Sequence, residues 1–166
     1  MGVQTAVMNK DSIESLLPLL AEQQRYCGRE IDPSRTRAFL EDFVGSETCF
    51  LVVASRHEAA VGFVMVDTQQ STQRAARAAY MHDAYVTESD RVMGGVGIRL
   101  ISTAFDEAAR RGYEFVEGET DTDNVNAQRL YEGMAKRLGI EYVREVSVRY
   151  RGDMRSLVER VRAEAS

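Results

Sequence analysis

The chain has 166 residues, of which 44% are hydrophobic and 28% are charged, and its formal net charge at pH 7 is −5. This composition is typical of a globular protein rather than a disordered one, and no apolar run approaches the roughly 20 residues that span a membrane. The acidic balance argues against sequence-independent binding to nucleic acid, which needs a basic surface, so we expect one globular domain over residues 1–166.

The N-terminal region predicts a short strand at Gln4–Met8, followed by two helices. Asp11 or Ser12 caps the first helix, and Pro18 lies inside its apolar pattern, so we expect a kink or a break at that residue. The Asp-Pro pair at residues 32–33 predicts the start of the second helix, because aspartate is a good cap and proline suits the first helical position.

The pattern then changes from helical to extended. Continuous apolar runs predict buried strands at Thr48–Ala54 and Ala60–Asp67, and the polar turn at Arg56–Glu58 joins them into an antiparallel hairpin. The polar residues Gln69–Arg77 are interpreted as a loop or a solvated strand end. Tyr80–Val86 is predicted to be the next strand.

The second half alternates helices and strands. Apolar residues at helical spacing follow a cluster of glycines and predict a helix that stops at Gly112. Tyr113–Glu119 is predicted to be a strand, and Asp123 opens another helix. Glu141–Tyr150 is predicted to be a late strand and Met154–Ala165 a charged final helix. This order of elements predicts a mixed α/β domain.

The glycine cluster is the most informative segment. Gly94, Gly95 and Gly97 follow a strand and precede an amphipathic helix, an arrangement whose backbone N–H groups suit a pyrophosphate. The cluster is not a P-loop, because Ile98 and Arg99 follow where that motif has Lys and Ser or Thr. Its position past the middle of the chain also excludes a dinucleotide-binding turn. An ordinary strand-to-helix connection remains the alternative.

A second motif lies after the following strand. Its residues have the pattern Asn-x-x-Ala-x-x-Leu-Tyr from Asn124 to Tyr131, which alone is also consistent with a helix cap and a core tyrosine. The glycine turn and this motif, in this order, resemble the GCN5-related N-acetyltransferase family from Gln4 to about Tyr150. The resemblance implies an α/β fold with a mixed, mostly antiparallel central sheet, flanking helices and splayed central strands.

The resemblance also implies a site for acetyl-CoA. In that family CoA enters between the splayed strands, so the backbone of Tyr85 and Val86 would hold the pantetheine arm and polarise the thioester. Asn124 would contact the same arm, and Tyr131 would protonate the leaving thiolate. The segment that would hold the pyrophosphate consists of Arg91, Val92, Met93, Gly94, Gly95, Val96 and Gly97.

The general base is predicted to be Asp83, since the resemblance includes family members with Asp in a similar position. An amine acceptor is protonated near neutral pH, so a base must remove a proton before attack. The alternative for Asp83 is a buried, paired carboxylate. His82 is expected on the opposite strand face and more often has a structural role. Glu88 and Glu119 are further candidates, although each is interpreted first as a solvated carboxylate.

The glycine turn departs from the family pattern Arg-x-x-Gly-x-Gly. Alignment on Gly95 and Gly97 puts Val92 at the arginine position, whereas alignment on Arg91 puts Val96 where a glycine belongs. The helix that follows favours the first alignment, in which the turn is one residue longer and Arg91 is displaced.

The predicted function is acetyl transfer from acetyl-CoA to the primary amine of a small, possibly polycationic, molecule, with no metal. Two alternatives stay open: a protein Lys or N-terminal acetyltransferase, and a CoA-binding regulator without turnover. We expect no nucleic-acid or membrane partner and a possible homodimer. Cys27 and Cys49 lack metal spacing, and the N-terminus lacks a secretory signal, which predicts a cytoplasmic protein.

Overall fold

The computed structural model describes residues 2–91, 95–139 and 141–145, together with the single residues 153, 154, 156, 158, 160 and 163. Contacts divide the chain into two compact units, Met1–Met134 and Ala135–Ser166. The first unit holds the sheet and the helices that cover it. The expectation of a single domain over residues 1–166 stays a prediction.

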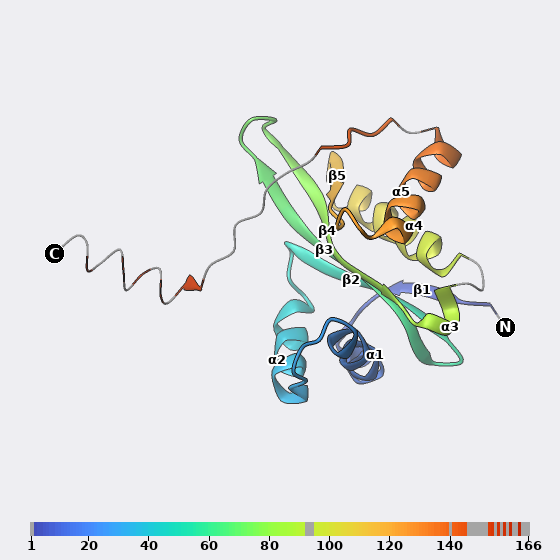
Figure 1. The fold of residues 1–166 in the computed structure, drawn as a ribbon, viewed down its shortest axis with the longest axis vertical. Helices are drawn as coiled ribbons and strands as arrows, with labels where there is room; N and C mark the ends of the chain where they lie inside the picture. The colour runs from blue at the N-terminus through green and yellow to red at the C-terminus, as the bar shows by residue number, and fades with distance from the viewer. Residues whose placement is uncertain are drawn as a thin grey trace. The chain divides into compact units, whose positions relative to one another are not determined.

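A five-stranded sheet forms the centre of the first unit (Figure 1). Its strands, in spatial and chain order, are β1 (Gln4–Val7), β2 (Cys49–Arg56), β3 (Ala59–Ser71), β4 (Ala76–Val86) and β5 (Phe115–Gly118). The first three pairings are antiparallel, and β4 pairs with β5 in parallel. This is the mixed, mostly antiparallel sheet that the sequence predicts.

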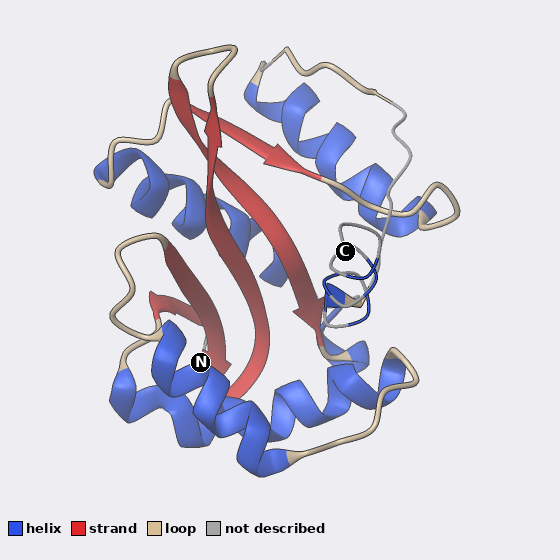
Figure 2. Ribbon diagram, turned by 90° about the vertical axis from the view of Figure 1, so that its left-hand side faces the viewer, coloured by secondary structure: helices blue, strands red, loops and turns tan. Residues whose placement is uncertain are grey.

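Helices cover both faces of this sheet (Figure 2). They are the 3-10 helix η1 (Lys10–Ser12), α1 (Ile13–Tyr26), α2 (Pro33–Phe43), α3 (Glu88–Arg91), α4 (Val96–Arg110) and α5 (Val125–Leu138). The helices α1 and α2 pack on one face through Leu16 and Leu40. The helix α4 packs on the other face through Leu100 and Ile101, together with Met134 of α5.

The strand β2 shows why an unbroken apolar run was needed. Val52 and Ala54 point into the core beneath α4, whereas Leu51 and Val53 point into the core beneath α1 and α2. A strand that is covered on both faces buries every side chain, so its sequence does not alternate between apolar and polar residues.

One expectation for the first unit needs correction. The helix α1 runs without a break from Ile13 to Tyr26, although Pro18 lies inside it. Leu16 and Leu19, on either side of the proline, are both buried, so core packing offsets a cost of about 3 kcal/mol for an internal proline. The polar stretch Gln69–Arg77, expected as a loop or a solvated strand end, contains both: its two ends pair in the hairpin of β3 and β4, and residues 72–75 form the turn.

The C-terminal expectations are met only in part. Residues 141–145 of the predicted strand Glu141–Tyr150 are neither helix nor strand, and residues 146–150 lie outside the described residues. This stretch of sequence does not by itself supply a strand for it to pair with. Those residues of the predicted helix Met154–Ala165 that the structure describes are helical, and Asp153 caps them by accepting a hydrogen bond from the Ser156 N–H at 2.9 Å.

Candidate functional site

The strands β4 and β5 part halfway along β4. Their parallel pairing runs from Ala78 opposite Phe115 to Met81 opposite Gly118, where β5 ends. The strand β4 continues for five more residues, to Val86, and stays paired with β3 on its other side. The edge of β4 that faced β5 therefore has no strand partner over these residues in the described part of the chain, as the predicted splay requires.

A β-bulge lies where the two strands part. Met65 pairs with Asp83 and Val66 with Met81, so His82 is an extra residue without a register partner. The bulge resets the alternation of β4, because Met81 belongs to the core beneath α4 and Tyr85 to the core beneath α1.

The bulge changes one expectation from the sequence. Because His82 is the extra residue of the bulge, strict alternation of side-chain faces does not hold between His82 and Asp83. The His82 Nε2 atom lies 3.7 Å from an Asp67 carboxylate oxygen. Burial raises the pKa of Asp67, His82 opposes that shift and Asp83 adds to it. Asp83 itself is exposed, so the alternative of a buried, paired carboxylate does not apply to it.

Tyr85 connects the end of β4 to α1. Its ring is buried, and its hydroxyl group donates a hydrogen bond of 2.9 Å to Glu22. Burial raises the pKa of Tyr85, and the hydrogen bond to Glu22 raises it further. The side chain of Tyr85 is thus fixed on the α1 face, which leaves its backbone at the open edge of β4.

Arg91 lies on the same side as Tyr85. Its Nε atom donates a hydrogen bond of 2.8 Å to the carbonyl oxygen of Val86, and its guanidinium group stacks over the rings of Tyr26 and Tyr85 at 5.1 and 5.2 Å. The arginine therefore contacts the end of β4 and the end of α1, and its displacement from the family position stays a prediction.

The glycine turn ends at the first residue of α4. Gly95 caps the helix with φ of 85°, a left-handed conformation that favours glycine. The first N–H groups of a helix have no partners within it, and no acidic residue occupies the first turn of α4, so this end suits an anion. The predicted residues Val92, Met93 and Gly94 lie outside the described residues.

The helix α5 approaches this end of α4. A Cβ atom placed on Gly97 would lie 3.3 Å from Leu130, so glycine allows the two helices to come close. Asn124 caps α5 by accepting a hydrogen bond of 3.2 Å from the Ala127 N–H. Tyr131 is half-buried against the core beneath α4, and this burial raises the pKa of its phenol.

The remaining candidate bases have solvated side chains. Glu88 lies on the exposed side of the short helix α3, and Glu119 is exposed directly after β5. Neither has the position on the open part of β4 that Asp83 has. This matches their first interpretation from the sequence.

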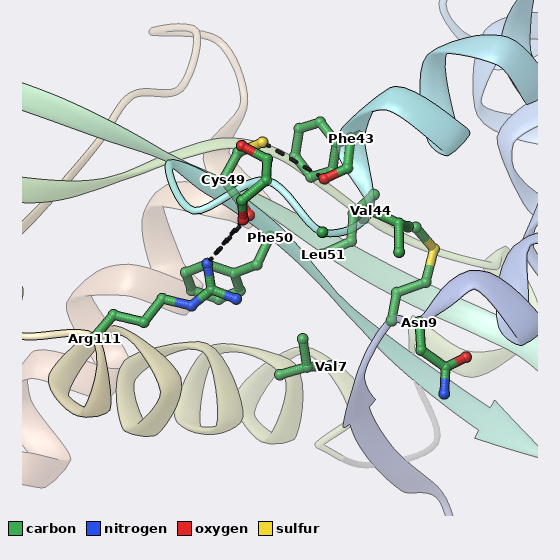
Figure 3. A pocket seen from close by; sticks show the side chains of 11 residues that line it. Val7, Asn9, Phe43, Val44, Cys49, Phe50, Leu51 and Arg111 are labelled. Atoms are coloured by element: carbon green, nitrogen blue, oxygen red, sulfur yellow. Dashed lines mark hydrogen bonds between the residues drawn. The ribbon is translucent and has the colours of Figure 1, made fainter.

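A pocket of about 260 Å³ lies at the opposite end of the sheet (Figure 3). It lies between the ends of β1 and α2 and the start of β2, with Arg111 on one side. The guanidinium group of Arg111 is already engaged, because it donates to Glu107 at 2.7 Å and to the Cys49 carbonyl at 3.3 Å and lies 4.5 Å from the Phe50 ring centre. None of the predicted site residues lines this pocket.

Within the described residues, no three His, Cys, Asp or Glu side chains form a group that could hold a metal ion. No helix in the same part of the chain combines the length and the apolar character needed to cross a membrane.

Sequence reasoning missed the residues that fix the site through distant contacts. Glu22 bonds to Tyr85, Asp67 lies beside His82, and Arg56 pairs with Asp90. Each pair joins two different elements, so spacing along the chain carries no sign of it. The one local signal was the pair of consecutive residues His82 and Asp83 in an otherwise apolar strand.

Comparison with known proteins gives a consistent assignment. Residues 13–135 match the family described as Acetyltransferase (GNAT) family. The curated protein YhfO of Bacillus subtilis (strain 168), described as an uncharacterized N-acetyltransferase, is 25% identical over 118 residues, which are 71% of this chain and 78% of that protein.

Two solved structures illustrate the likeness of fold. The ribosomal-protein-alanine N-acetyltransferase of Brucella melitensis biovar Abortus 2308 has a TM-score of 0.71 at 19% identity, covering 92% of this chain and all of that one. The aminoglycoside acetyltransferase AAC(6')-Iy, solved with the bisubstrate analogue CoA-S-monomethyl-acetylneamine, has a TM-score of 0.72 at 19% identity, covering 92% and 99%. The chain therefore belongs to the acetyltransferase (GNAT) family and is an N-acetyltransferase.

Proposed function

We propose that this enzyme transfers the acetyl group of acetyl-CoA to the primary amine of a small molecule, by direct attack in a ternary complex. The observation that carries the proposal is the parting of β4 from β5 after Met81 and Gly118. It leaves the edge of β4 from His82 to Val86 without a strand partner in the described part of the chain, just before α3 and the glycine turn.

The proposed cosubstrate site follows from that edge. The backbone of Tyr85 and Val86 binds the pantetheine arm, much as an added strand would bind, and Asn124 contacts it from α5. The N–H groups at Gly95–Gly97 bind the pyrophosphate, supported by the partial positive charge at the start of α4. The sequence places Val92–Gly94 in the same turn, and we include them in the proposal. Arg91 supplies positive charge beside it.

The proposed chemistry needs one base, one oxyanion donor and one acid. Asp83, which is exposed on β4, accepts the proton of the acceptor's ammonium group. The amine nitrogen then attacks the thioester carbonyl, and the backbone N–H of Val86 stabilises the oxyanion. When the C–S bond breaks, Tyr131 donates its phenolic proton to the thiolate. Burial raises the pKa of Tyr131, which keeps the phenol protonated at neutral pH.

A small cationic acceptor is supported by charge and by structural likeness. The chain has a net charge of −5, and Asp83 and Asp67 place carboxylates together where β4 and β5 part. One similar structure binds a bisubstrate analogue derived from an aminoglycoside. The similar fold of a ribosomal-protein-alanine N-acetyltransferase favours a second candidate, acetylation of a protein N-terminus.

Thiol release from acetyl-CoA tests the proposal and separates the two acceptors. Purified enzyme is assayed with α,ω-diamines, an aminoglycoside, and peptides that begin with alanine or contain lysine. The proposal expects turnover with at least one small amine at a higher kcat/KM than with any peptide. Turnover with the peptides alone would transfer the assignment to a protein acetyltransferase. Binding of acetyl-CoA without any turnover would favour a regulator.

A further inference from the structure

Asp90 is a buried carboxylate that the proposed reaction does not use. It lies on α3, between the end of β4 and the glycine turn, and only 10% of its side chain is exposed. One carboxylate oxygen lies 2.8 Å from the Arg56 guanidinium group, at the end of β2. The ion pair therefore connects the β2–β3 hairpin to α3, which in turn contacts α4.

The neighbouring residue Thr87 strengthens the same connection. Its hydroxyl group donates a hydrogen bond of 2.9 Å to the second oxygen of Asp90, and its carbonyl group accepts one of 3.0 Å from the Asp90 N–H. The Thr87 N–H donates to the carbonyl oxygen of Val61 at 2.9 Å. Val61 is the extra residue of a bulge in β3, between the pairs Ala54–Gly62 and Ser55–Ala60. Backbone and side-chain contacts thus hold α3 against the hairpin.

The ion pair is better suited to fixing a position than to adding stability. The Asp90 Oδ1 atom meets Arg56 only in this ion-pair contact, because neither it nor the buried Arg56 Nε atom has a hydrogen-bond partner in the described part of the chain. A buried ion pair with incomplete hydrogen bonding recovers little of its desolvation cost. Its short contact nevertheless links the end of β2 to α3. We expect this pair to act through geometry.

The turn before β3 supports this interpretation. His57 and Glu58 both have positive φ angles, of 49° and 68°, although neither is glycine. Arg56 pairs with Ala59, so His57 and Glu58 form a tight two-residue hairpin turn, whose favoured type has positive φ at both positions. The tight turn sets the position of Arg56 directly before it, at the end of the strand. The hairpin thereby presents the guanidinium group to Asp90 at a defined place.

We propose that Arg56 and Asp90 are positioning residues for acetyl-CoA, which hold α3 so that the start of α4 meets the pyrophosphate. This inference rests on the proposed function. Neither residue contacts the cosubstrate. Their loss weakens the part of binding that depends on the pyrophosphate and leaves the chemical step intact.

The test compares two acetyl donors in steady-state kinetics. S-acetylpantetheine carries the thioester and the arm but lacks the pyrophosphate, whereas acetyl-CoA carries both. Arg56→Met is expected to raise KM for acetyl-CoA about tenfold, to leave kcat within twofold, and to leave kcat/KM for S-acetylpantetheine unchanged. Arg56→Lys, which keeps the charge, is expected to recover part of the loss. Arg37→Met is the matched control, because it breaks the exposed ion pair between Arg37 of α2 and Glu14 of α1.

Parallel losses with both donors, or an unchanged KM for acetyl-CoA in Arg56→Met, would overturn the inference. Asp90→Asn provides a second route if Arg56→Met does not fold, because it keeps the shape of the side chain and the same pattern is expected. Failure of the proposed function looks different, because the wild-type enzyme would then use neither donor.

Discussion

The hydroxyl group of Tyr85 donates a hydrogen bond of 2.9 Å to the carboxylate of Glu22, and so joins β4 to α1 at the point where β4 has left β5. The bond is needed because a strand paired on one side only has fewer contacts to hold it. Arg91 adds to the same junction by stacking on Tyr85 and bonding to Val86.

Removal of this hydrogen bond is expected to lower stability. Tyr85→Phe keeps the buried ring but loses the donor, so the free energy of unfolding should fall by about 1–2 kcal/mol. Urea denaturation measures the change. Tyr142→Phe is the matched control, because Tyr142 is exposed. An equal change in both variants would contradict a specific role for the bond to Glu22.

The close approach of Gly62 to β4 predicts that a side chain at this position would disturb the packing. A Cβ atom at this position would lie 3.0 Å from the carbonyl oxygen of Tyr85 and 3.1 Å from Leu100. Gly62→Ala should therefore push β4 and α4 away from β3, lower the free energy of unfolding by about 1–3 kcal/mol, and reduce kcat/KM for acetyl-CoA.

The matched substitution is Gly133→Ala in α5. A Cβ atom there meets nothing within 4 Å, and alanine is the better helix former by up to about 1 kcal/mol. Thermal unfolding should show opposite signs for the two variants. A stabilised Gly62→Ala variant would mean that β4 is not held closely at this point.

The lowered pKa of Glu107 predicts that the stability of the protein depends on pH. It is a buried carboxylate that accepts hydrogen bonds from Arg110 at 2.7 and 2.8 Å and from Arg111 at 2.7 Å. The bonds from Arg110, the largest cause, and from Arg111 lower its pKa below the usual 4.5, while burial opposes them. A lowered pKa in the folded state contributes stability above pH 4.5 that is lost as the pH falls through the folded value.

Glu107→Gln removes the titrating group and keeps the shape. The free energy of unfolding at pH 7 should fall by about 1–3 kcal/mol, and the difference from wild type should shrink as the pH falls below 4.5. Denaturation curves from pH 3 to pH 7 measure this. For the exposed Glu14→Gln control, little change is expected at any pH. A difference that stays constant with pH would contradict the account.

The proposed role of Tyr131 as the acid predicts that a variant without its hydroxyl group is slow in the chemical step. Without its phenolic hydroxyl, the thiolate leaves unprotonated, so Tyr131→Phe should lower kcat by about 10²–10⁴-fold. The Kd for acetyl-CoA should stay within about threefold, because the ring remains. Single-turnover kinetics and calorimetry measure the two quantities. A raised Kd with an unchanged kcat would assign Tyr131 to binding instead of catalysis.

Local signals explain what the sequence could predict. The Asp32–Pro33 pair starts α2 where expected, because cap and proline act within one turn. The glycine turn before α4 follows from residues adjacent in the chain, as does the apolar run of β2. These features, with the motif from Asn124 to Tyr131, were enough to predict the family and the arrangement of the sheet.

Features that depend on distant contacts could not be predicted in this way. The bulge at His82 depends on how β3 and β4 pair, and pairing over a bulge leaves no mark on the strand itself. The helix α1 continues through Pro18 because its flanking leucines are buried by other elements. The ion pair of Arg56 and Asp90 joins residues that only the fold brings together.

The most direct test of the account is thermal unfolding of the wild-type protein at increasing concentrations of acetyl-CoA. A ligand at 100 times its Kd stabilises the folded state by about 2.7 kcal/mol, which for a chain of this size corresponds to a rise in Tm of about 5–10 °C. We expect this rise for the wild-type protein, and a smaller one for Arg56→Met. An unchanged Tm at millimolar acetyl-CoA would contradict the assignment of the edge of β4 and the start of α4 as the cosubstrate site.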